Sequence, residues 1–74
     1  MTLGEFLEKD DRKAMEAMVL WIVKEKFGEH SWIYRAYRDK IDRVTTSDLK
    51  ILIECQASDV LIGKDLNVVL NSLD

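Results

Sequence analysis

The sequence predicts an all-α protein, a small bundle of four to five short helices around one long central helix, forming a single helical domain over residues 1–74. Two observations carry this prediction. The chain has no proline and only three glycines, which is not typical of a β-sandwich with frequent turns. Its apolar residues, 47% of the total, recur mainly at helical spacing. A chain of this length has barely enough core to offset its conformational entropy, so we expect a partner.

The first two helices are predicted from their starts and ends. Thr2 opens a Thr-x-x-Glu capping box, which predicts a short helix over residues 3–8. Asp10 or Asp11 is then placed to cap a long helix over residues 12–27. The glycine that follows is typical of the left-handed position that ends helices.

The middle of the chain predicts two more helices. Ser31 can cap a third helix that runs to about Asp42. Residues 49–55 fit two patterns, because their apolar residues alternate as in a strand and also share one helical face. The preceding run TTSD supplies two candidate caps, Thr45 and Thr46, so we favour a helix.

A last helix is predicted after Gly63, where apolar residues follow an i, i+3, i+4, i+7 pattern. The residues of this stripe are Leu66, Val69, Leu70 and Leu73.

The run MVLWIV, residues 18–23, holds more apolar side chains than one face of a helix can hide. Either the other helices wrap this segment completely, or part of it contacts another chain. In the second case, we expect the surplus face of the long helix to pair with the C-terminal stripe. The predicted protein interface then consists of Met18, Trp21, Ile22, Leu66, Val69 and Leu70.

Residues 26–43 gather basic and aromatic side chains, which is also typical of a nucleic-acid surface. The candidate residues are Trp32, Arg35, Arg38 and Arg43. Asp39 and Asp42 stand four residues after two of these arginines, so we favour a solvated, salt-bridged face. Nucleic acid and an acidic protein partner are the alternatives, and the net charge of −3 weighs against nucleic acid. Trp32 is expected to cover the core as a lid.

The sequence predicts no enzyme activity, no metal site, no cofactor and no small-molecule substrate. It contains no phosphate-binding loop and no Ser/His/Asp set. One cysteine and one histidine cannot complete an all-Cys/His zinc site. We expect His30 to be a loop or cap residue, and Cys55 to be a small buried apolar residue.

The same features favour a cytoplasmic protein that has no contact with a membrane. A single cysteine cannot form an internal disulfide, which fits a reducing compartment. No apolar run approaches the length of a membrane span, and the N-terminal residues MTLGEFLEKDD lack the basic and apolar regions of a signal peptide.

Residues 27–70 resemble the small C-terminal helical module of Rpn-type, transposase-associated nuclease-like proteins. The positions that carry the likeness are Phe27, Gly28, Ile41, Leu49, Ile53, Ala57 and residues 66–70. The nuclease core that precedes the module in those proteins is absent here. The resemblance therefore implies an interaction part without the catalytic part, with dimerisation or capping of a longer partner as its role.

Taken together, these patterns predict a small protein-binding module or regulator. We expect it to self-associate as a homodimer, and to inhibit or cap a larger protein partner. A nucleic-acid-associated regulator is the alternative.

Overall fold

The computed structural model describes residues 2–60 and 65–73, and within them every regular element is helical. The elements are α1 (Leu3–Glu8), α2 (Arg12–Phe27), α3 (Trp32–Lys40), the short 3₁₀ helix η1 (Ile41–Arg43), α4 (Thr46–Val60) and α5 (Leu66–Asn71). The prediction of an all-α protein is confirmed. Residues 49–55 lie within α4, so the helical interpretation of that segment is also confirmed.

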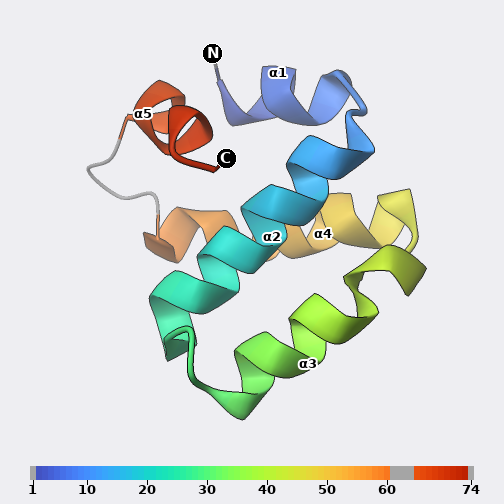
Figure 1. Ribbon diagram of the computed structural model, residues 1–74. Coiled ribbons are helices and arrows are strands. Elements are labelled where there is room, and N and C mark those ends of the chain that lie inside the picture. Colours follow the sequence, from blue (N-terminus) through green and yellow to red (C-terminus); the bar gives the residue numbers. More distant parts are fainter. Residues whose placement is uncertain (1, 61–64, 74) are drawn as a thin grey trace.

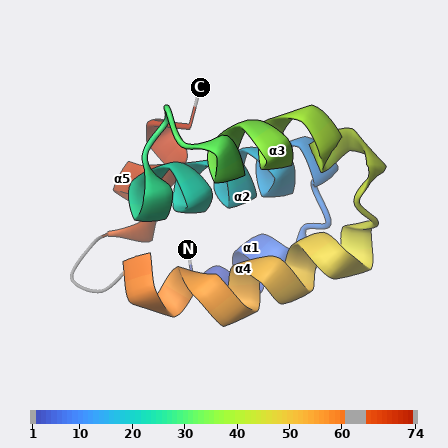
Figure 2. The same cartoon turned by 90° about the horizontal axis from the view of Figure 1, so that it is seen from below.

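The helices form two layers. Seen from below, α2 and α3 lie in one layer and α4 lies in the other (Figure 2). Helices α1 and α5 lie together beside the first half of α2, on the side opposite α3 (Figure 1). One long central helix is not confirmed, because α2 has 16 residues and α4 has 15. These two helices make the most extensive contact in the bundle.

Each α-helix starts at a residue whose side chain accepts a hydrogen bond from the first turn. The capping residues are Thr2, Asp11, Ser31, Thr45 and Asp65. In the predicted capping box, the Glu5 N–H donates to the Thr2 hydroxyl at 3.2 Å and the Thr2 N–H donates to the Glu5 carboxylate at 3.3 Å. Each such cap contributes about 1 kcal/mol, so the polar residues between helices set where the helices begin.

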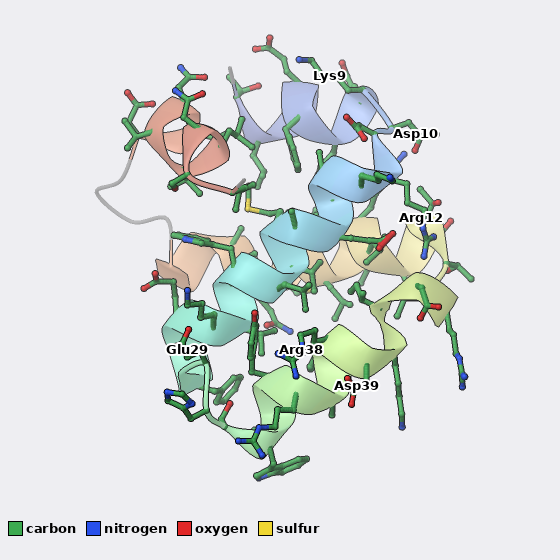
Figure 3. All side chains as sticks on the ribbon, in the orientation of Figure 1. Lys9, Asp10, Arg12, Glu29, Arg38 and Asp39 are labelled. Carbon is green, nitrogen blue, oxygen red and sulfur yellow. The ribbon has the colours of Figure 1, made fainter. Side chains whose placement is uncertain are left out.

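The third helix ends earlier than predicted, and Arg12 holds the segment that follows it. After α3 the chain tightens into η1, which contains Asp42. The Arg12 guanidinium donates to the carbonyls of Ile41 and Asp42, each at 3.2 Å, and to the Thr46 hydroxyl at 3.4 Å. Its Nε also pairs with Glu16 at 3.1 Å. Arg12 (labelled in Figure 3) thus ties η1 and the start of α4 to the start of α2.

The core lies between the two layers and draws on α1, α2, η1, α4 and α5. Its buried side chains are Phe6, Leu7, Met15, Met18, Val19, Ile22, Val23, Ile41, Leu49, Ile53, Ala57 and Val69. Four of the six residues of MVLWIV are in this set, and Leu20 and Trp21 are half-buried. The single chain therefore buries most of that segment by itself, because α4 covers the inner face of α2.

Candidate functional site

Three of the six residues of the predicted protein interface are buried in the core of the bundle. The exposed fractions of Met18, Ile22 and Val69 are 0%, 1% and 4%, so these side chains do not reach the surface of the described fold. The sequence pattern marked them as apolar, but it did not show that α4 would cover them. Trp21, Leu66 and Leu70 are half-buried and do reach the surface.

The outer face of α2 carries two adjoining hollows: the first is lined mostly by apolar side chains, and the second mixes apolar side chains with the polar groups of Lys24, Tyr34 and Ser72. Ala17 and Leu73 line both, so the two hollows are continuous. The hollow on the α1 side is lined by Phe6, Lys9, Asp11, Lys13, Ala14, Ala17, Leu70 and Leu73, and has a volume of about 390 Å³. The hollow toward α3 is lined by Ala17, Leu20, Trp21, Lys24, Tyr34, Ser72 and Leu73, and has a volume of about 300 Å³. We call this surface the α2 face.

A third hollow adjoins these two on α3, and we include it in the α2 face. It is lined by Glu29, His30, Tyr34, Arg35 and Arg38, and Tyr34 also lines the preceding hollow. The Arg38 guanidinium carbon lies 5.9 Å from the centre of the Tyr34 ring, within cation–π distance. Figure 3 shows Arg38 on the side of α3 that faces α2. This contact holds one cation at the edge of the apolar surface.

The predicted salt bridges along α3 are wrong. Neither Arg35 nor Arg38 lies within 4 Å of a carboxylate in the part of the chain that the structure describes. For Arg38 the reason is geometric: η1 starts at Ile41, so Asp42 does not follow one α-helical turn after the arginine. Arg38 packs on Tyr34 instead.

Trp32 does not cover the core. Its exposed fraction is 77%, the highest among the large apolar side chains of the described residues, so the lid prediction is wrong. Ile33, Tyr34 and Tyr37 pack against the core from α3, which leaves Trp32 pointing to solvent at the first turn. Arg43, at the end of η1, is exposed as well but does not line the third hollow.

Cys55 and His30 are both on the surface. Cys55 is an exposed free thiol, so the prediction of a small buried residue is wrong. The buried stripe of α4 runs through Leu49, Ile53 and Ala57, and a residue two positions after Ile53 points to the other side of the helix. His30, with an 89% exposed side chain, is a loop residue as predicted, and its Nε2 lies 3.6 Å from Glu29.

No group of three or more His, Cys, Asp or Glu side chains in the described ranges is arranged to hold a metal ion. Within the same residues, no helix combines the length and the apolar content needed to cross a bilayer.

No protein family, curated protein or solved structure matches this chain. The resemblance of residues 27–70 to the Rpn-type module stays a prediction. The functional assignment therefore depends on the chemistry of the surface alone.

Proposed function

We propose that this chain is a small non-enzymatic module of the cytoplasm that works by binding protein, and that the α2 face is its contact surface. The observation that carries the proposal is the pair of continuous hollows along the outer side of α2, in which the half-buried apolar side chains of Leu20, Trp21 and Leu70 reach the surface. The role that follows is regulation or capping of the bound protein. The exposed free thiol of Cys55 fits a reducing compartment.

The α2 face has a shape that suits a helix or an extended segment of a partner. Ala14 and Ala17 are small, so they let a partner backbone approach α2 closely, while Trp21 and Leu70 provide larger apolar walls. Protein interfaces gain most of their binding energy from a few buried aromatic and apolar anchors, and Trp is prominent among them. The hollows are at the lower end of the range of about 300–1,000 Å³ that is usual for small-molecule sites. A protein partner therefore fits better than a small ligand.

The test places a charge in the middle of the α2 face. Ala17→Arg adds a long cation to both hollows, and Ser47→Arg adds the same side chain to the exposed first turn of α4 as a control. We expect proteins that are cross-linked to the wild-type chain in cells to be lost with Ala17→Arg and kept with Ser47→Arg. Far-UV circular dichroism of both variants checks that the fold is retained. If the wild type and both variants cross-link to the same proteins, the α2 face is not the contact surface.

The homodimer that the sequence predicts is one form of this function, and it is tested by solution mass. Light scattering across a dilution series gives a dimer mass that falls on dilution if the α2 face pairs with a copy of itself. A constant monomer mass would exclude the homodimer and leave a different protein as the partner.

A nucleic-acid-binding regulator is the second candidate, and the exposed Trp32 favours it. An indole that is 77% exposed, one turn before Arg35, offers a stacking surface beside a cation that has no carboxylate within 4 Å among the described residues. Binding of a fluorescent single-stranded oligonucleotide should then weaken steeply with salt and should be lost in Trp32→Ala. No change in anisotropy at low salt would exclude this candidate.

A further inference from the structure

Most of the cations around the α2 face have no carboxylate partner in the part of the chain that the structure describes. The basic residues that line its hollows without an ion pair within 4 Å, among the residues described, are Lys9, Lys13, Arg35 and Arg38. Lys24 also lines the face and pairs with Glu29 at 3.6 Å. The whole chain has a net charge of −3, so an excess of positive charge on one face is a local feature.

Two carboxylates, of Asp11 and Glu29, stand against five lysine and arginine cations in the lining of the three hollows, so the positive charge is offset only in part. Asp11 caps α2, where its carboxylate accepts a hydrogen bond from the Ala14 N–H at 3.3 Å. Glu29 is shared between Lys24 and His30, each at 3.6 Å. The α2 face therefore combines half-buried apolar side chains with a border of net positive charge.

From this charge pattern we infer that the α2 face binds an acidic amphipathic helix of a different protein. The inference depends on the proposed function and specifies its partner. Apolar side chains at i, i+3, i+4 and i+7 of the partner fill the hollows above Ala14 and Ala17. Carboxylates on both sides of that stripe meet the border cations, which speeds association and selects against basic partners.

A second copy of the chain is a poorer occupant. In a two-fold symmetric dimer the same surface patch meets itself, so the unpaired cations of one copy would approach those of the other. Like charges at an interface oppose association unless each meets an acid, and this face has two carboxylates for its five cations.

A lipid surface also fits less well than a protein helix. Side chains that enter a membrane interface protrude beyond the surrounding residues. On the α2 face the apolar side chains are half-buried and line hollows, whereas Lys9 and Lys13 are exposed around them. A surface that is recessed at its apolar centre accepts protruding side chains of a partner.

The experiment uses three fluorescein-labelled peptides of the same length as α2. They share one leucine stripe and differ only in the residues beside it, which are Glu, Gln or Lys. At low salt we expect the Glu peptide to bind the full chain about tenfold more tightly than the Lys peptide, because several individually weak border pairs add up. Fluorescence anisotropy gives the three dissociation constants, and the difference should shrink at high salt.

Charge reversal on the face tests whether these cations are responsible. In the double variant Lys13→Glu with Arg38→Glu the order of the Glu and Lys peptides should reverse. Arg43→Glu makes the same change at an exposed residue outside the three hollows and should leave the order as in the wild type. Circular dichroism confirms that the variants keep their helices.

The outcomes separate the inference from the proposed function. If all three peptides bind equally and Ala17→Arg weakens them all, the face binds protein without charge selection, and the inference is wrong. If no peptide binds, the inference is wrong and the proposed contact surface loses its support. Binding only to vesicles that contain phosphatidylserine would assign the face to a membrane. A dimer that hides the face, shown by light scattering, would identify a second copy as the occupant.

Discussion

At the scale of single residues, the side chain of Arg12 connects α2 to η1 and to the start of α4, and no pattern in the sequence indicates these contacts. One guanidinium satisfies two carbonyls of η1, the Thr46 hydroxyl and the Glu16 carboxylate. These partners lie about thirty positions away in the sequence, apart from Glu16, so no local rule could assign them. The sequence placed Arg12 at the start of a helix and could not show what its side chain reaches.

We predict that Arg12→Ala lowers the free energy of unfolding by about 1–3 kcal/mol, because it removes charge-assisted hydrogen bonds to partly buried groups. Lys13→Ala, at the next and exposed position, should change stability by less than about 0.5 kcal/mol. Urea unfolding followed by circular dichroism gives both values. Equal effects of the two substitutions would contradict the assigned role of Arg12.

Two glycines should respond in opposite directions to the same substitution. Gly28 has a φ of 89°, a conformation that alanine adopts only with strain, although nothing lies within 4 Å of an added Cβ. Gly28→Ala should therefore destabilise the protein by about 1 kcal/mol. Gly4 lies within α1, and its added Cβ would meet only an ordinary contact at 3.9 Å. Gly4→Ala should stabilise the protein by up to about 1 kcal/mol, and the midpoints of urea unfolding compare the two.

At the scale of elements, the polar residues between helices predicted the helix boundaries well, and the apolar patterns predicted the type of element less well. The caps at Thr2 and Ser31, and the glycine after α2, fixed those boundaries correctly because capping is local. The apolar residues of 49–55 could not separate strand from helix, and the cap at Thr45 decided correctly. The end of α3 was missed, because η1 is held by a contact from Arg12.

The two isoleucines of α4 test its helical stripe. Ile53 is 0% exposed and packs in the core, whereas Ile51 is 55% exposed. Ile53→Ala should cost about 2–5 kcal/mol of unfolding free energy, and Ile51→Ala less than about 0.5 kcal/mol. Chemical denaturation of both variants provides the measurement. A large loss at Ile51 would mean that this side of α4 is covered in solution.

At the scale of the whole molecule, the candidate surface was only partly predictable. The sequence identified an apolar excess in α2 and a basic, aromatic stretch in α3, but it treated them as separate features. The fold places Tyr34 of α3 beside Leu20 and Trp21 of α2, and so makes one continuous surface. The burial of Met18 and Ile22 depends on packing against α4, which a single sequence does not reveal.

The single core predicts a single unfolding transition. Four of the α-helices and η1 contribute to one buried cluster, so none of the described elements has a separate core that could unfold independently. Circular dichroism, which reports the helices, and tryptophan fluorescence, which reports α2 and α3, should give the same midpoint and the same urea dependence. Two separated transitions would show that the chain is not one cooperative domain.

The position of Cys55 provides an oriented point of attachment. It is the only thiol of the chain, and it is exposed on the side of α4 that points away from α2. A maleimide tether at Cys55 would fix every molecule to a sensor surface in the same orientation, with the α2 face directed toward the solution. The native sequence can therefore be immobilised for binding measurements without an added tag and without covering the surface under test.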